Sequence, residues 1–529
     1  MLIIFNNFFP LQIIYISNPV STLLLTAFQH LFNTKNCPFS LSISDFLQKT
    51  AIIISDFLQK TAVFISDFLQ KTLYLHQKEK IMDKKYYSRH IDKYLIEWKN
   101  EENHKPLLLR GARQVGKSSA IRQLGKTFKY FVEVNFERDK DIYSIFTANL
   151  KSKEIANRLS AYYGVPIIPG KTLLFLDEIQ ACTEAIHSLW FFYEDYPELH
   201  VIAAGSLLEF ALKRVTSFGV GRVRSLFMYP MSFDEFLNAV GNKNWIEVKQ
   251  NSSSQNPVFE ALHGKLVEMF RNYLIVGGMP EAVSTWINTG DLLKCQQIQD
   301  DIMLAYEDDF SKYEDKTDPL LLRQTLRSVA LQVGSKFVYS QVQGNYRTEK
   351  VKEALDLLKY AGLIRPVIHT AANGIPLGAE INEKFVKYIF LDSGLLLRLL
   401  GLENINGQSE MSKLILVGNA SDLVNKGSVT EMVVGLEFLK YSTPTQRHDL
   451  YYWQNLSRGA QAEVDYIIIK DAKVVPVEVK AGYSGSMKSM YQFMSAKNIE
   501  YGIRTSLENF SAIGRVDILP LYALSNIFA

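Results

Sequence analysis

The feature that most constrains the fold of this chain is a strand, loop and helix pattern between residues 106 and 128. Residues 106–110 read PLLLR, an apolar run typical of a buried parallel strand, and GARQVGKSS and the helical AIRQLGKTF follow directly. The loop satisfies the pattern GxxxxGK(S/T), in which backbone N–H groups surround phosphates, the lysine reaches the β and γ phosphates and the hydroxyl binds Mg²⁺. The sequence therefore predicts an ATP site with Mg²⁺ on the Ser118 hydroxyl, formed by Gly111, Ala112, Arg113, Gln114, Val115, Gly116, Lys117, Ser118 and Ser119.

Two further apolar runs end in polar residues that suit the same chemistry. LLFLDE ends in Asp177 and Glu178, and HVIAAGS ends in Ser206. We expect Asp177 to hold Mg²⁺ through water and Glu178 to polarise the attacking water, because phosphoryl transfer needs mainly positioning and electrostatics. Ser206 is expected to contact the γ-phosphate or that water.

An arginine pair follows in GVGRVRSLFMYP, a segment that we expect to form a loop. The guanidinium of Arg222 could reach a γ-phosphate in its own chain or in a neighbouring subunit. The sequence leaves open a second interpretation, in which the arginine is exposed or pairs with Asp234 or Glu235.

The middle of the chain reads as helical. RNYLIVGGMPEAV places a glycine pair and a proline between two apolar helical stretches, which predicts either a hinge or a rigid packing turn. Beyond it, helices at 320–333 and 348–360, a short helix at 337–344 and a strand after Gly362 follow the order of a winged helix. Residues 320–366 hold eight basic and three acidic residues, which leaves contact with DNA and contact with protein as alternatives.

The C-terminal part contains a carboxylate, carboxylate and lysine pattern on successive strands. We expect strands at 450–454, 463–469 and 474–480, the last two antiparallel, with Glu478 and Lys480 on the same side of one strand and Asp465 on its neighbour. Such a group suits Mg²⁺ held by the two carboxylates, with the lysine activating water toward a phosphodiester. Glu431 is the expected additional acid, and the alternative is a set of salt bridges on a sheet face.

The first 81 residues stand apart. ISDFLQKT occurs at 43–50, 54–61 and 65–72, and the period of 11 suits a right-handed coiled coil. Positions that would face solvent are copied as faithfully as the apolar ones, so we prefer duplicated DNA and an extension without a fold. Residues 1–34 lack charged side chains, but prolines interrupt the apolar run, and we do not expect a membrane anchor.

Together, GARQVGKSS, LLFLDEIQ, AAGSLLEF, GRVRSLFMYPMSFDEFL, YLIVGGMPEAV and PVEVKAG resemble bacterial and archaeal AAA-type P-loop ATPases that carry a C-terminal domain of unknown function similar to PD-(D/E)XK nucleases. The resemblance implies an α/β chain: a P-loop AAA-like parallel sheet core with a helical lid, a winged-helix middle domain and a restriction-endonuclease-like α/β C-terminal domain. The expected divisions are 1–81, 82–231, 232–315, 316–375 and 376–529.

Composition adds little to this interpretation. The 58 Lys and Arg nearly balance the 55 Asp and Glu, so any surface for nucleic acid must be local. Three distant cysteines predict neither a disulfide framework nor a zinc site, and we expect a cytoplasmic protein. The prediction is an ATPase with ATP and Mg²⁺ as cofactors and a DNA-facing C-terminal half, and it allows a homo-oligomer. The alternatives are a metal-dependent endonuclease regulated by ATP and a signalling ATPase with protein-interaction modules.

Overall fold

The computed structural model describes residues 61, 85–147, 151–206, 221–313, 317–401, 426–483 and 485–528. The repeat-containing segment 1–81 lies outside the described residues apart from Thr61, and Cys37 lies outside them as well. Residues 85–529 form one compact unit, in which Cys182 and Cys295 are buried and free.

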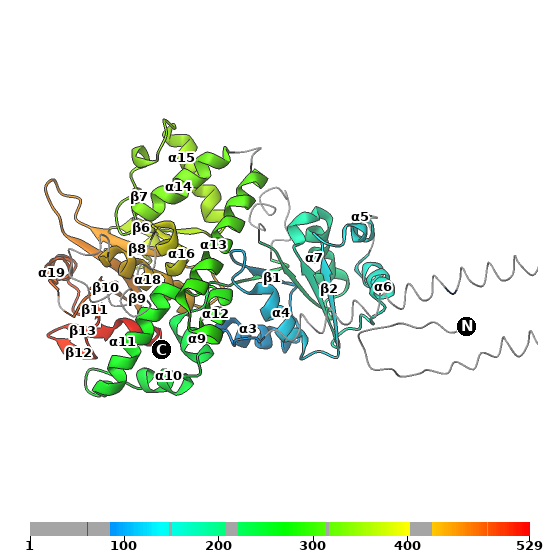
Figure 1. Ribbon diagram of the computed structural model, residues 1–529, viewed down its shortest axis with the longest axis horizontal. Helices are drawn as coiled ribbons and strands as arrows, with labels where there is room; N and C mark the ends of the chain where they lie inside the picture. Colours follow the sequence, from blue (N-terminus) through cyan, green and yellow to red (C-terminus); the bar gives the residue numbers. More distant parts are fainter. Residues whose placement is uncertain are drawn as a thin grey trace, which may run out of the picture. The chain divides into compact units, whose positions relative to one another are not determined.

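The first layer of this unit is a five-stranded parallel sheet (Figure 1). Its strands lie in the order β2-β3-β4-β1-β5, and β1 is hydrogen-bonded to β4 and β5 on its two sides. Their bounds are β1 (Leu107–Arg110), β2 (Tyr130–Asn135), β3 (Thr172–Asp177), β4 (His200–Ala204) and β5 (Arg224–Phe227). Because all five strands run the same way, their carboxyl ends meet at one edge of the sheet.

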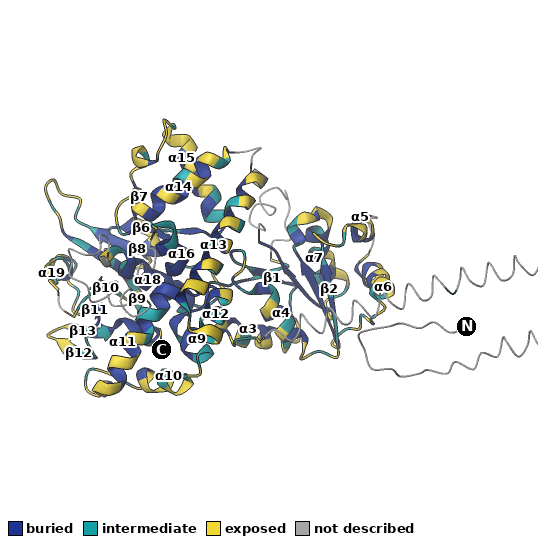
Figure 2. Ribbon diagram, in the orientation of Figure 1, coloured by how far each residue is buried: buried dark blue, intermediate teal, exposed yellow. Residues whose placement is uncertain are grey.

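Both faces of this sheet are covered by helices, as the continuous apolar sequence of its strands requires (Figure 2). Leu107 and Leu109 face one core, which also contains residues of α3 and α4, whereas Leu108 faces a second core with residues of α5, α6 and α7. The helices on these faces are α3 (His90–Lys99), α4 (Lys117–Gly125), α5 (Tyr143–Thr147), α6 (Ser152–Tyr163) and α7 (Thr183–Asp195), with short turns η1 (Lys140–Ile142) and η2 (Ile179–Ala181).

A helical region follows the parallel sheet. Its bounds are α9 (Phe233–Ala239), α10 (Lys243–Gln250), α11 (Glu260–Val276), α12 (Pro280–Thr289), α13 (Leu292–Asp309) and η3 (Phe310–Tyr313). The glycine pair between α11 and α12 is tightly packed: a Cβ on Gly277 would lie 2.1 Å from Asp392 Oδ1, and one on Gly278 would lie 2.2 Å from the Met231 carbonyl oxygen. These positions require glycine because the Asp392 carboxylate and the Met231 backbone approach so closely, and the hinge and the rigid packing turn both stay predictions.

The remaining strands form one mixed sheet in the order β12-β13-β11-β10-β9-β8-β6-β7. The elements of this part are α14 (Pro319–Leu331), η4 (Tyr339–Gln341), α15 (Thr348–Tyr360), β6 (Ile364–Thr370), η5 (Leu377–Glu380), β7 (Ile381–Phe390), α16 (Ser393–Leu399), α18 (Lys426–Tyr441), β8 (Leu450–Gln454), β9 (Glu463–Lys470), β10 (Lys473–Val479), α19 (Lys488–Ala496), β11 (Gly502–Ser506), β12 (Ser511–Ile513), β13 (Val516–Pro520) and η6 (Leu521–Ile527).

One feature of each sheet differs from the expected layout. The boundary expected between residues 375 and 376 falls between β6 and β7, which pair with each other, and β6 also pairs with β8 of the C-terminal part. The sheet therefore continues across that boundary, and the winged helix stays a prediction. In the first sheet, Arg224 begins the edge strand β5 where we expected a loop, because β5 gains its pairing from β1, more than a hundred residues upstream. Within the described ranges, no helix is both long and apolar enough to cross a membrane.

A pair of buried histidines lies at the amino end of β4. The rings of His104 and His200 stack with centroids 3.8 Å apart, and both meet Trp98 edge-on. His200 Nε2 lies 3.0 Å from the Lys99 carbonyl oxygen. Burial, followed by the neighbouring His104, lowers the pKa of His200 to about 4.

This pKa predicts a pH-dependent stability. Between pH 6.5 and 4 the unfolded chain binds a proton at residue 200 that the folded chain does not bind, so stability is lost as pH falls through this window. At pH 5 the loss from His200 is about 2 kcal/mol of unfolding free energy. Urea unfolding at pH 7 and pH 5, followed by tryptophan fluorescence, should show a smaller loss for His200→Phe than for the wild type. Equal losses would contradict this assignment.

Candidate functional site

The phosphate-binding loop joins β1 to α4 at the carboxyl edge of the parallel sheet. Its two glycines have positive φ angles, 152° at Gly111 and 101° at Gly116. A Cβ on Gly111 would lie 2.2 Å from the carbonyl oxygen of Met228, so a larger residue would displace the segment that follows β5. The glycines expected from the sequence therefore stand where the backbone requires them.

Lys117, the first residue of α4, is buried within this loop. Its Nζ donates hydrogen bonds to the carbonyl oxygens of Gly111, at 2.9 Å, and Ala112, at 2.7 Å. Burial lowers the pKa of Lys117 to about 8, although Glu178 and Asp177 oppose this shift. The amine is thus held inside the loop by two backbone carbonyl oxygens.

The hydroxyl of Ser118 lies against the carboxylate of Asp177 at the end of β3. Ser118 Oγ is 3.2 Å and 3.3 Å from the two carboxylate oxygens, and Asn135 Nδ2 donates to one of them at 3.3 Å. Burial raises the pKa of Asp177 to about 6, with Glu178 adding to the effect. Mg²⁺ prefers oxygen ligands, and the hydroxyl of Ser118 and the carboxylate of Asp177 lie side by side. These two residues therefore fit the expected ion.

Glu178 and Ser206 also come together at this edge. The carboxylate of Glu178 accepts hydrogen bonds from Gln180 Nε2 at 2.6 Å and from the backbone nitrogen and Oγ of Ser206, each at 3.4 Å. Glu178 has φ 51°, a left-handed conformation that is costly for a residue with a Cβ and that is concentrated at functional sites. The structure thus brings the two residues expected to handle water into direct contact.

Arg222 has other partners. Its Nε donates to Glu194 of α7, and its guanidinium lies 4.9 Å from the ring centroid of Trp190. Neither Asp234 nor Glu235, the partners considered from the sequence, takes this role. The side chain remains 39% exposed, which leaves it accessible to a neighbouring subunit.

Arg113, at the tip of the loop, is bound to the helical region. Its Nη1 lies 2.7 Å from both carboxylate oxygens of Asp309 at the end of α13, and Tyr306 donates its hydroxyl to the Arg113 carbonyl oxygen at 2.6 Å. Sequence reasoning named Arg113 but missed Asp309 and Tyr306, because no local pattern links positions so far apart in the chain.

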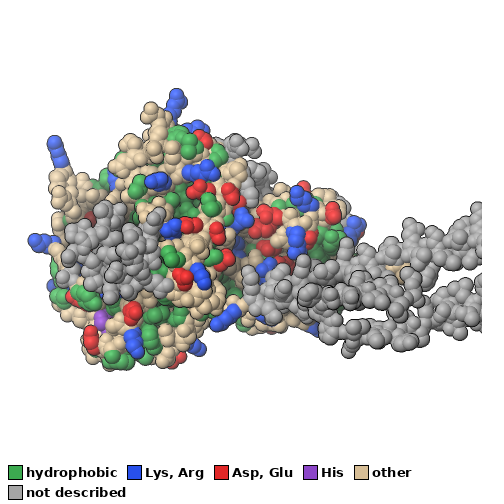
Figure 3. Space-filling model, viewed as in Figure 1, with side chains coloured by type: hydrophobic (Ala, Val, Ile, Leu, Met, Phe, Trp, Pro, Cys, Tyr) green, Lys and Arg blue, Asp and Glu red, His purple; other side chains and the backbone are tan. Residues whose placement is uncertain are grey.

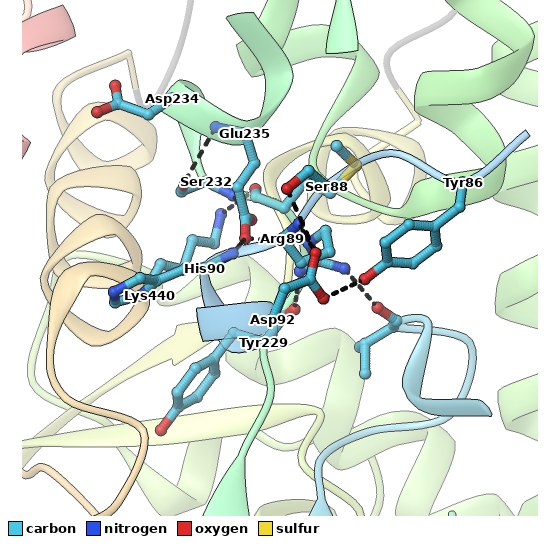
Figure 4. A network of polar contacts seen from close by, with 12 residues as sticks. Tyr86, Ser88, Arg89, His90, Asp92, Tyr229, Ser232, Asp234, Glu235 and Lys440 are labelled. Carbon is cyan, nitrogen blue, oxygen red and sulfur yellow. Dashed lines mark hydrogen bonds and ion pairs between the residues drawn. The ribbon is translucent and has the colours of Figure 1, made fainter. Parts of the chain in front are cut away.

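A second missed residue is Arg89, the residue before α3. Its guanidinium is buried and donates to the Val115 carbonyl oxygen of the loop at 2.9 Å and to the Tyr229 carbonyl oxygen at 2.7 Å (Figure 4). Its Nε forms an ion pair of 3.1 Å with Glu235 of α9. Asp92, three residues later, accepts from the Arg89 backbone nitrogen at 2.8 Å, but Arg89 and Asp92 do not match the capping-box pattern, so no sequence signal marked this position.

The network of Arg89 continues into the C-terminal part. Glu235 caps α9 together with Ser232, and the backbone nitrogen of Phe233 donates to Glu437 of α18 at 2.9 Å. Glu437 is paired with Lys440 at 3.0 Å, and the Lys440 amine donates to the Met231 carbonyl oxygen at 3.1 Å. Buried polar contacts therefore connect the phosphate loop to α18.

The carboxylates expected to form a second metal site have partners for some of their oxygens, whereas Glu478 Oε2 is buried without a hydrogen-bond partner among the described residues. Lys387 of β7 is 2.9 Å from Glu431 and 2.5 Å from Glu463. Lys480 is 2.6 Å from Glu478, and Asp465 accepts from the Val479 backbone nitrogen at 2.7 Å. In the part of the chain that the structure describes, no group of three or more His, Cys, Asp or Glu side chains is arranged to hold a metal ion. The expected site of two carboxylates and a lysine stays a prediction, and the contacts in the structure are ion pairs and a backbone hydrogen bond.

Burial shifts the pKa values of the residues in these ion pairs. The Lys387 side chain is 2% exposed. Burial alone would lower the pKa of Lys387, but Glu431 and Glu463 outweigh it and raise the pKa above its ordinary value. Burial raises the pKa of Glu431 to about 8 and that of Glu478 to about 7. Sequence reasoning missed Lys387 because it lies in a strand outside the motif.

The basic residues of 320–366 are partly neutralised. Lys350 pairs with Glu353 at 2.7 Å, Lys359 with Asp356 at 2.5 Å and Arg323 with Glu307 at 3.2 Å. On the face shown in Figure 3, Lys and Arg side chains are interspersed with Asp and Glu side chains. Glu353 and Asp356 already belong to the sequence count of 320–366, so only Glu307, which lies outside that range, adds to the neutralisation.

Comparisons with known proteins agree with the first site. Residues 103–237 match the family described as AAA domain, residues 267–406 match a domain of unknown function (DUF8612), and residues 426–524 match a domain of unknown function (DUF4143). No curated protein sequence matches the chain. The matches identify the first segment as a P-loop AAA domain and confirm the C-terminal domain of unknown function. The similarity to PD-(D/E)XK nucleases stays a prediction.

Two solved structures are similar to parts of the chain. One is the Aeropyrum pernix ORC1 protein in complex with DNA, with 12% identity over 60% of this chain and 93% of that chain and a TM-score of 0.24. The other is Drosophila ORC bound to DNA, with 16% identity over 59% of this chain and 84% of that chain and a TM-score of 0.23. TM-scores of this size support no argument about this chain.

The buried ion pairs of Lys387 give a testable prediction. Lys387→Met should lower the free energy of unfolding by about 1.5 to 3 kcal/mol, because it removes the buried amine that pairs with the partly exposed Glu431 and Glu463. Urea unfolding at pH 7 measures this change. Lys384→Met, at an exposed position of the same strand, is the matched control and should have almost no effect. A loss below about 1 kcal/mol for Lys387→Met would contradict the assigned ion pairs.

Proposed function

We propose that the AAA domain of this chain hydrolyses ATP with Mg²⁺ and that the nucleotide state governs a C-terminal half that faces DNA. The observation that carries the first part is the meeting of Lys117, Ser118, Asp177, Glu178 and Ser206 at the carboxyl edge of one parallel sheet. Three separate segments supply these side chains. Their contacts suit the three tasks of phosphoryl transfer, which are to hold the phosphates, to bind Mg²⁺ and to orient the attacking water.

The roles follow from the contacts. The backbone of residues 111–119 surrounds the phosphates, and Lys117 exchanges its two loop carbonyls for phosphate oxygens. Ser118 and Asp177 hold Mg²⁺, which neutralises charge on the phosphates when it is bound. Glu178 orients the attacking water, and Ser206 keeps that carboxylate in place. Arg222, exposed beside Glu194, supplies a guanidinium to the site of a neighbouring subunit.

The DNA-facing part rests on α15 and the residue before it. Arg347 and Lys352 are exposed near the start of this helix, which leaves two cations open to a phosphate backbone after Lys350 pairs with Glu353. The ion-paired carboxylates of the C-terminal sheet do not favour the endonuclease alternative. ATP hydrolysis that is stimulated by duplex DNA, without nicking of plasmid, would support the proposal. Hydrolysis indifferent to single-stranded, duplex and branched DNA would favour a partner protein instead.

The hydrolysis site gives a prediction with two variants. Lys117→Ala should abolish hydrolysis, whereas Glu178→Gln should still bind ATP but cleave it about 10²-fold or more slowly, because only water activation is lost. At an ATP concentration about 100 times the dissociation constant, Mg-ATP should stabilise the wild type by about 2.7 kcal/mol. Phosphate release and thermal unfolding measure these effects, with Lys151→Ala as a surface control. An unchanged melting temperature at saturating ATP would refute the site.

The role of Arg222 gives a separate prediction. Arg222→Ala should slow hydrolysis by about 10³-fold and leave ATP affinity nearly unchanged, because the guanidinium acts on charge in the transition state. Mixing Arg222→Ala with Lys117→Ala protein should restore activity, since each supplies what the other lacks. Glu194→Gln removes only the partner and should keep activity. Failure of the mixture to recover would exclude a role between subunits.

A further inference from the structure

Gln180, the last residue of the LLFLDEIQ motif, makes the shortest hydrogen bond to the Glu178 carboxylate. The motif continues into the turn η2, in which the Ala181 backbone nitrogen donates to the Glu178 carbonyl oxygen at 3.0 Å. This turn brings residue 180 back beside residue 178, and Gln180 Nε2 donates to Glu178 Oε2 at 2.6 Å. A carboxylate only accepts hydrogen bonds, so the amide nitrogen is the atom that faces it. The proposed function uses Asp177 and Glu178 but not Gln180.

The hydrogen bonds to Glu178 are unequally divided between its two oxygens. Oε2 accepts from Gln180 Nε2 and, at 3.4 Å each, from the backbone nitrogen and Oγ of Ser206. No donor within the described residues reaches Oε1. Because 3.4 Å is long for a hydrogen bond, Gln180 supplies most of the restraint on Oε2. The other oxygen is left to accept a proton from water, which a general base does at about 2.6 to 3.2 Å.

Three unfavourable local features accompany this one contact. Glu178 has φ 51°, and Gln180 Oε1 is buried without a hydrogen-bond partner among the described residues. Residue 205 must be glycine, because a Cβ there would lie 1.9 Å from Gln180 Oε1 and 3.0 Å from Gln180 Cδ. Left-handed residues with a Cβ and buried polar atoms without partners are both rare, and both are concentrated at functional sites. The amide of Gln180 therefore lies where local stability alone would not place it.

We propose that Gln180 is a positioning residue for ATP hydrolysis, which holds Glu178 Oε2 so that Oε1 is directed at the attacking water. This inference rests on the proposed function and deepens the role that it gives to Glu178. Because Gly205 packs against the amide and precedes Ser206, the segment after β4 determines where the Gln180 side chain lies. A residue that only orients the base affects the hydrolytic step and leaves nucleotide binding unchanged.

The first test replaces Gln180 by methionine, which has a similar length but cannot donate the hydrogen bond. Gln180→Met should lower kcat by about 10-fold to 100-fold, because a misdirected carboxylate loses much of its effect on the water. The KM for ATP should change by less than about twofold. Phosphate release at a series of Mg-ATP concentrations measures both constants. Gln123→Met, at an exposed position of α4, is the matched control and should change neither constant.

Two further comparisons distinguish positioning from a structural role. Gly205→Ala should lower kcat to a similar extent although Gln180 is intact, because the new methyl group takes the place of the amide oxygen. Gln180→Ala combined with Gly205→Ala should be no slower than Gln180→Ala alone, since the side chain that clashes is gone. In Glu178→Gln protein, Gln180→Met should change the residual single-turnover rate by less than about twofold, because the carboxylate that Gln180 holds is absent.

The outcomes separate this inference from the proposed function. If the wild type releases no phosphate from ATP, the proposed function is wrong and this inference fails with it. If the wild type hydrolyses ATP, and Gln180→Met keeps its kcat, exceeds it or raises KM as strongly as it lowers kcat, only this inference is overturned. An equal loss from Gln180→Met in the wild-type and Glu178→Gln proteins would also overturn it, because Gln180 would then act through another group.

Discussion

The buried guanidinium of Arg89 is the interaction on which the arrangement of the described chain depends. One side chain binds the phosphate loop at Val115, the segment after β5 at Tyr229 and α9 at Glu235. A buried charge is tolerated only where hydrogen bonds and a counter-charge compensate its lost hydration, so these three segments are held to one geometry. The backbone of α9 is hydrogen-bonded in turn to Glu437 of α18. A continuous set of buried polar contacts therefore links the phosphate loop to this C-terminal helix.

The sequence was sufficient wherever a motif and a strand end coincide. Asp177 ends β3 and Ser206 follows the end of the adjacent parallel strand β4, so the alignment of β3 with β4 is enough to bring the two strand ends together. The helix at 348–360 and the strand at 450–454 have the expected bounds, since apolar periodicity and local turns define them. The hairpin of β9 and β10 is antiparallel as expected, and the left-handed Asp471 and Ala472 form its turn.

What the sequence could not provide are partners that meet only in the folded chain. Asp309 reaches Arg113 across 196 positions, and Lys387 reaches Glu463 across 76. No local periodicity encodes such pairs: the motif contained Asp465, Glu478 and Lys480 but not Lys387, which pairs with Glu431 and Glu463. The continuity of β6 with β8 was missed in the same way, because parallel pairing depends on elements between the strands.

The contacts of Lys117 suggest a route by which bound nucleotide would alter the structure outside the AAA domain. Before a phosphate binds, the amine is held by the Gly111 and Ala112 carbonyls, and under the proposed function it must exchange them for phosphate oxygens. Gly111 packs closely against the Met228 carbonyl, and Ala112 packs closely against Gly362. Closely packed backbone shifts between discrete arrangements more readily than it deforms. Under the proposed function, a change at the two carbonyls would meet the turn after α15 first, because Gly362 packs against Ala112 and leads directly into β6.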